Sequence, residues 1–178
     1  MDRDNRPDQI AVFHFADTAS LWRFAKVPVV DVVDAAVRVL LDGTESASIN
    51  RIACLIAADA EAELGDLLND LEDIGLDLLA FGHPDTEVVA AAALCRRYVQ
   101  DGTDAQALTS QVHNVFGHRC HPLIEVLSNL GDMFDTLDCV PNPSRQRLEA
   151  NTKAAAEDLI AEADRLLTRA LGIGGGGV

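Results

Sequence analysis

The sequence predicts an all-α protein, a compact array of about seven to nine helices, on three observations. Apolar residues recur at helical spacing from Pro28 onward, and no segment shows the sustained alternation of a half-buried strand. Aromatic residues make up only 4% of the 178-residue chain, so Leu, Val, Ile and Ala must fill the core, as in closely packed helices. We expect one helical domain over residues 1–171 and a flexible glycine-rich tail over 172–178.

The first half of the chain predicts four helices and one ambiguous segment. Residues 8–15 fit either a short helix or a strand, and a short helix is expected to begin at a Thr18 cap. A proline in the first turn and a glycine after the last turn are typical helix boundaries. The later helices are expected from Pro28 to Asp42, from Ser46 or Ser48 to Ile56, and from about Asp59 to Ile74.

The second half predicts further helices and ends on a long amphipathic one. Asp85 is expected to cap the N-terminus of a helix that runs to Gln100, because aspartate oxygens accept from the free amides there. Another helix is expected from Asp104 to Phe116. A short helix over 123–129 and a further turn should follow. The last helix, over 144–171, has apolar or small residues at a period near 3.6, so it should be one straight amphipathic rod.

The net charge of −15 excludes some partners. Nucleic-acid binding is driven by cations that displace counterions from phosphates, so we expect no nucleic-acid partner. No apolar run approaches the ~18 residues of a membrane span, and the charged N-terminus is not of signal-peptide type, so we expect no membrane partner and a cytoplasmic location. Four widely spaced cysteines should then be reduced, with Cys54 and Cys95 as small core residues.

No catalytic residues are predicted. The sequence lacks the nucleophile elbow, the zinc-protease motif, the phosphate-binding loop and the calcium loop. A G-x-G-x-x-G match at Gly172, Gly174 and Gly177 follows a helix and ends the chain, whereas a dinucleotide site needs a strand before and a helix after. An enzymatic role is therefore unsupported, and no cofactor is expected.

A histidine- and cysteine-rich segment, "HNVFGHRCHP", is the one stretch that raises the question of a metal. Zinc prefers four nitrogen or sulfur ligands, commonly as two closely spaced pairs. Adjacent loop residues rarely all point at one ion, and a fourth ligand would have to come from Asp135 or Cys139. We therefore favour a structural loop in which His118 meets the last carbonyls of the preceding helix. The alternative metal ligands are His113, His118, Cys120, His121 and Cys139.

Acidic residues recur at steps of three and four in the middle of the chain. Between Arg51 and Glu87, ten acids face one base, a local balance of −9. On one helix, six of them would share a face, opposite a leucine face, and so form a docking surface for a basic partner. Replacing aspartates there with asparagine should leave the fold intact or stabilise it slightly, because like charges repel along a helix. The predicted partner-binding residues are Asp59, Glu63, Asp66, Asp70, Asp73 and Asp77.

The sequence thus predicts a small acidic helical protein that acts by protein–protein interaction with a basic partner, as a regulator, inhibitor or immunity-type protein. Two alternatives stay open. The His/Cys cluster over 113–139 could bind a metal or small ligand, or the last helix could pack against its copy in a structural homo-oligomer.

Overall fold

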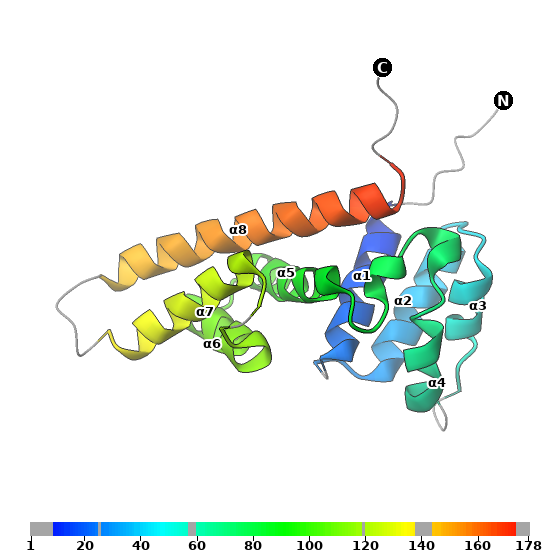
Figure 1. Ribbon diagram of the computed structural model, residues 1–178, viewed down its shortest axis with the longest axis horizontal. Helices are drawn as coiled ribbons and strands as arrows, with labels where there is room; N and C mark the ends of the chain where they lie inside the picture. Colours follow the sequence, from blue (N-terminus) through cyan, green and yellow to red (C-terminus); the bar gives the residue numbers. More distant parts are fainter. Residues whose placement is uncertain (1–8, 25, 57–59, 119, 138–143, 174–178) are drawn as a thin grey trace, which may run out of the picture. The chain divides into compact units, whose positions relative to one another are not determined.

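All regular secondary structure in the described part of the chain is helical, which confirms the predicted fold class. The computed structural model describes residues 9–24, 26–56, 60–118, 120–137 and 144–173, and these contain no strand. Figure 1 shows the helices in chain order. They are α1 (Gln9–Arg23), α2 (Val29–Leu41), α3 (Ala47–Ala53), α4 (Ala60–Leu67), the 3-10 turns η1 (Glu72–Ile74) and η2 (Asp77–Leu79), α5 (Pro84–Asp101), α6 (Ala105–Phe116), α7 (Pro122–Asp135) and α8 (Arg145–Ala170).

The chain forms two compact units, whose boundaries fall inside α5 and α8. Unit 1 holds residues 1–86 and 166–178, and unit 2 holds residues 87–165. In unit 1, α2 packs against α1, α3 and α4, and in unit 2, α6 packs against α7. The expectation of a single domain over 1–171 stays a prediction.

Helix α1 corrects the two-segment prediction for the N-terminal region. One helix covers both the ambiguous segment and the expected short helix. Thr18 lies inside it rather than at its N-terminus, and its hydroxyl donates to the carbonyl of His14 at 2.7 Å. That bond keeps the hydroxyl satisfied without ending the helix. Buried Val12, Phe15 and Ala19 give the helix a core-facing side.

Several predicted helix boundaries are confirmed. Helix α2 follows Pro28 and stops before Gly43, which has a φ of 90°. Ser46 caps α3 by accepting from the amide of Ile49 at 3.0 Å, and Asp104 caps α6 by accepting from that of Ala107 at 3.2 Å. The long C-terminal helix is α8, preceded by Ser144.

Three expectations in the second half of the chain need correction. Helix α5 begins at Pro84, so Asp85 lies within it, and the amide of Asp85 donates to Nδ1 of His83 at 3.2 Å. The short helix and further turn expected after Pro122 are one helix, α7. At the end of α8 the amide of Ile173 donates to the carbonyl of Thr168 at 3.1 Å. Residues 172 and 173 thus close the helix, while the rest of the expected tail, 174–178, lies outside the described residues.

The largest correction concerns the expected helix from Asp59 to Ile74, which ends at Leu67. The chain then turns through η1 and η2. Gly75 separates these turns with a φ of 71°, a left-handed conformation that favours glycine. Three of the leucines that suggested one long helix, Leu64, Leu68 and Leu71, are still buried, because the turn after α4 keeps the last two in the core.

Candidate functional site

The acidic residues that sequence analysis placed on one helical face lie on several elements. Asp59 lies outside the described residues. Glu63 and Asp66 are exposed on α4, whereas the other three follow the end of that helix in the turns that lead to α5. The single aligned stripe is therefore wrong, although Asp70, Asp73 and Asp77 are all exposed.

Two of these acids make contacts within unit 1. Asp70 pairs with Arg51 at 3.6 Å, and both side chains are more than half exposed. Asp73 accepts from the hydroxyl of Ser46 at 2.8 Å and from the amide of Ser48 at 3.2 Å, so it supports the N-terminus of α3. Burial alone would raise the pKa of Asp73, but these hydrogen bonds favour the carboxylate and lower it. Asp73 therefore has a structural role.

Asp73 is expected to stabilise the fold, which reverses the sequence expectation for this position. Asp73→Asn should cost about 1 kcal/mol at neutral pH, because solvent screening at this exposed position weakens the hydrogen bonds to the charged group. Folding lowers the pKa of Asp73. The stabilisation is therefore fully present at a pH above the ordinary aspartate pKa of about 4, and it is lost as the pH falls through the lowered pKa of the folded protein. Urea unfolding of both proteins across this pH range measures it.

Asp66→Asn is the matched control for that measurement, because it removes the same charge from an exposed position on α4. Equal stability of Asp73→Asn and the wild type at neutral pH would show that the Ser46 and Ser48 contacts do not stabilise α3.

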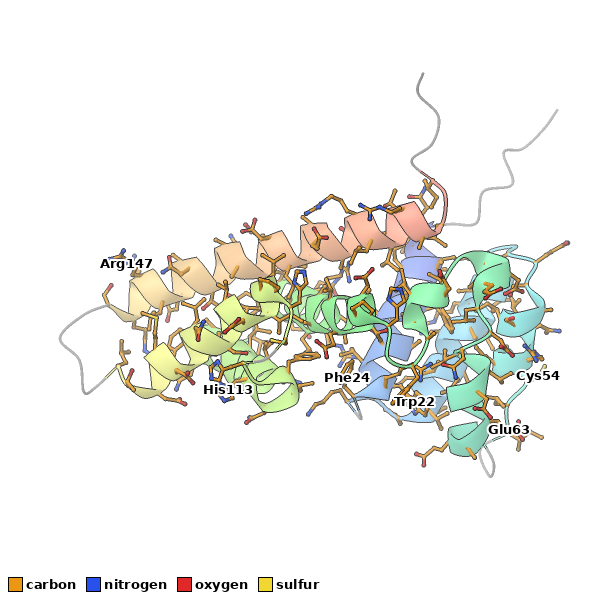
Figure 2. All side chains as sticks on the ribbon, in the orientation of Figure 1. Trp22, Phe24, Cys54, Glu63, His113 and Arg147 are labelled. Atoms are coloured by element: carbon orange, nitrogen blue, oxygen red, sulfur yellow. The ribbon has the colours of Figure 1, made fainter. Side chains whose placement is uncertain are left out.

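A shallow pocket lies beside Glu63 between α3 and α4. Its volume is about 380 Å³. Figure 2 labels Cys54, which directly follows α3, and Glu63 on α4. Cys54 is exposed, contrary to the expectation of a core residue, whereas Cys95 is buried and burial raises the pKa of its thiol to about 12. The pocket residues are Arg51, Cys54, Leu55, Ile56, Glu63 and Leu67.

An exposed phenylalanine, Phe81, lies in the turn between η2 and α5. Its side chain is 85% exposed. The turn is nevertheless held in place: the amide of Phe81 donates to Oδ1 of Asn69 at 2.9 Å, and the hydroxyl of Thr86 donates to the carbonyl of Leu78 at 2.7 Å. Arg23 reaches the same turn from α1, donating to the carbonyl of Leu79 at 2.7 Å and to Oδ1 of Asn69 at 2.9 Å.

Backbone hydrogen bonds also hold the two acid-bearing turns that precede Phe81 in the chain. The amide of Asn69 donates to the carbonyl of Asp66 at 3.0 Å, and Asp70 is the next residue along the chain. Nearer to Phe81 in the chain, the amide of Ala80 donates to the carbonyl of Asp77 at 2.9 Å. An exposed apolar ring thus lies on a fixed turn, and the exposed acids Asp66, Asp70 and Asp77 precede it in the chain.

In unit 2, a reversal of the chain brings His118 back to His113. The amide of Gly117 donates to the carbonyl of His113 at 2.9 Å and ends α6. Gly117 has a φ of 66°, which an L side chain rarely adopts. The two imidazole rings meet edge to face, with centroids 4.7 Å apart and planes at 88°. We expected His118 to meet the last carbonyls of α6, but the structure places its ring against that of His113.

Asp132 of α7 lies against both rings. Its Oδ1 is 3.2 Å from Nδ1 of His113, and its Oδ2 is 3.2 Å from Nε2 of His118. One potential ligand atom from each of the three residues lies within 4.8 Å of the others. All three side chains are between 37% and 51% exposed, so the cluster is open to solvent (Figure 2 labels His113).

The other metal candidates lie elsewhere or outside the described residues. His121 precedes α7, and its Nδ1 accepts from the amide of Leu123 at 3.3 Å. The thiol of Cys120 donates to the carbonyl of Gly117 at 3.5 Å. Burial, with Glu87 and Glu125, raises the pKa of that thiol, which disfavours the thiolate that binds metals. Cys139 lies outside the described residues.

Sequence reasoning missed Asp132 and Phe81. Asp132 lies one helix away from the histidines, and only the packing of α6 against α7 brings it to them. Phe81 follows two buried leucines, and its sequence environment does not distinguish it from a core residue. A detectable signal was its position before Gly82, in a turn that begins the next helix.

No protein-family model, curated protein or solved structure matches the chain. In the described part of the chain, no helix is both long and apolar enough to cross a membrane.

Proposed function

We propose that the protein acts by binding a basic protein partner through a surface of unit 1. This surface, called the Phe81 surface below, comprises Glu63, Asp66, Asp70, Asp77 and Phe81. Four of these residues are acids expected from the sequence, and Phe81 is added because its ring is exposed. Asp73 is left out because its carboxylate supports α3. The proposed setting is the cytoplasm, where the exposed thiol of Cys54 would stay reduced.

The observation that carries the proposal is the exposure of Phe81 on a turn held by side-chain hydrogen bonds. Aromatic residues dominate the binding energy of many interfaces when a partner buries them. A turn already fixed by Arg23, Asn69 and Thr86 loses little conformational freedom on binding. Phe81 can therefore act as an anchor that needs no rearrangement.

The exposed acids of unit 1 that precede Phe81 in the chain indicate the sign of the partner's charge. Complementary charge acts mainly on the rate of encounter, and at ~0.15 M salt it reaches about a Debye length of ~8 Å. A partner with Lys or Arg around an apolar cavity fits both parts of the surface. The α3–α4 pocket includes Glu63 and can accept an aliphatic side chain of the same partner.

The proposal can be tested with a random peptide-display library selected on the full-length protein. We expect enriched peptides to carry net positive charge and an apolar residue. For the best peptide, the double variant Asp66→Asn with Asp77→Asn should slow association several-fold at low salt and flatten its salt dependence, with dissociation nearly unchanged. Surface plasmon resonance at two salt concentrations measures these rates.

Asp101→Asn with Asp158→Asn is the matched control, because it removes the same charge from two exposed positions in unit 2. If the two double variants slowed association equally, the attraction of the peptide would depend on net charge alone. Association that is unaffected by Asp66→Asn with Asp77→Asn would contradict the assignment of this surface.

A further inference from the structure

The histidine–aspartate cluster of unit 2 is built from three segments that the fold brings together. His113 comes from the last turn of α6, His118 from the reversal after Gly117, and Asp132 from α7. Sequence analysis favoured a structural loop because its candidate ligands were neighbours in the chain. Asp132 removes that objection, since it approaches the histidines from another helix.

The ligand set has the chemistry of a transition-metal site. Imidazole nitrogen suits zinc, copper, nickel and iron, and a carboxylate oxygen completes a mixed nitrogen and oxygen set. Zinc bonds of about 2.0–2.2 Å place two ligands of a tetrahedral ion about 3.4 Å apart. Each histidine nitrogen lies 3.2 Å from one oxygen of Asp132, Oδ1 for His113 and Oδ2 for His118, which is close to that separation. The remaining pair is formed by the two histidine nitrogens, which lie within 4.8 Å of each other. Rotation of the two rings would bring both nitrogens within bonding distance of one ion.

We propose that His113, His118 and Asp132 bind one divalent transition cation of the zinc class. Nδ1 of His113, Nε2 of His118 and a carboxylate oxygen of Asp132 supply three ligands, and solvent fills the remaining position. The exposure of the three side chains gives the ion a direct route into the site. Because the ligands join α6 to α7, the bound ion fastens these two helices and stabilises unit 2.

Without an ion, the same geometry fits a carboxylate that accepts one hydrogen bond from each imidazole. Asp132→Asn separates these two roles. An asparagine oxygen still accepts a hydrogen bond from an imidazole, but it lacks the negative charge that a metal ligand supplies. The variant should therefore keep the fold and lose the metal.

The experiment titrates metal-free, full-length protein with Zn²⁺ by calorimetry, and with Co²⁺ by visible absorption. We expect one ion per chain and a higher melting temperature with Zn²⁺. The affinity should fall at least tenfold in His118→Ala and in Asp132→Asn. Circular dichroism of both variants checks that they remain folded.

Two variants serve as matched controls. His83→Ala removes a partly exposed imidazole that lies 4.0 Å from a single carboxylate, that of Asp85, and Cys120→Ser removes a thiol two residues after His118 that donates to the carbonyl of Gly117. Both should bind Zn²⁺ as the wild type does. The proposal is overturned if the wild type binds no stoichiometric ion, or if Asp132→Asn and His118→Ala keep full affinity. It is also overturned if the two controls lose as much affinity as Asp132→Asn and His118→Ala.

Discussion

Replacing Gly75 with alanine is expected to destabilise the protein by about 3 kcal/mol. Gly75 has a φ of 71°, where an alanine costs about 1–2 kcal/mol. A Cβ at this position would also overlap the carbonyl oxygen of Ala170, a backbone atom at the end of α8 in the same unit. Relieving that overlap requires a backbone shift, which typically costs a further 1–3 kcal/mol. Chemical denaturation measures the change.

Gly43→Ala is the matched control. Gly43 has a φ of 90°, but a Cβ there would meet nothing within 4 Å. This variant should show only the backbone cost, about 1 kcal/mol. If Gly75→Ala and Gly43→Ala were equally stable, the close approach of the residue 75 turn to the end of α8 would be wrong.

Gly131→Val is expected to destabilise unit 2 by about 2 kcal/mol or more. Gly131 is buried in α7, and a Cβ there would lie 3.3 Å from the carbonyl oxygen of Thr109 in α6. Branched carbons beyond that Cβ would force the two helices apart, as in other overpacked cores. Because Asp132 is the next residue, the same change should also weaken Zn²⁺ binding.

Gly131→Ala separates crowding from the loss of glycine. Alanine favours a helix by about 1 kcal/mol over glycine, which offsets the tight contact with Thr109. Its stability should therefore stay close to that of the wild type. A Gly131→Val variant as stable as Gly131→Ala would contradict the close packing of α6 on α7.

Local sequence signals predicted the helices whose boundaries are set by nearby residues. Pro28 and Gly43 bound α2, and Asp104 and Gly117 bound α6. The end of α4 was not predictable in this way. Leu64, Leu68 and Leu71 are spaced as on one helix and are all buried, yet a helix and a turn bury them equally well.

The candidate sites depended on packing that local patterns do not contain. His113 and His118 were recognised as candidate ligands, but the carboxylate that meets them is Asp132, three residues before the Asp135 considered from the sequence. Similarly, Asp73 belongs to an acidic run, and its role follows only from its contact with Ser46, 27 residues earlier.

The most direct test of the proposed function is the effect of Phe81→Ser on binding of a basic peptide selected on the wild-type protein. We predict that its dissociation constant rises about thirtyfold, from the loss of about 2 kcal/mol at a central aromatic anchor, mainly through faster dissociation. Leu41→Ser, which removes another largely exposed apolar side chain, should leave binding unchanged. Unchanged affinity of Phe81→Ser, or an equal loss in Leu41→Ser, would contradict the account.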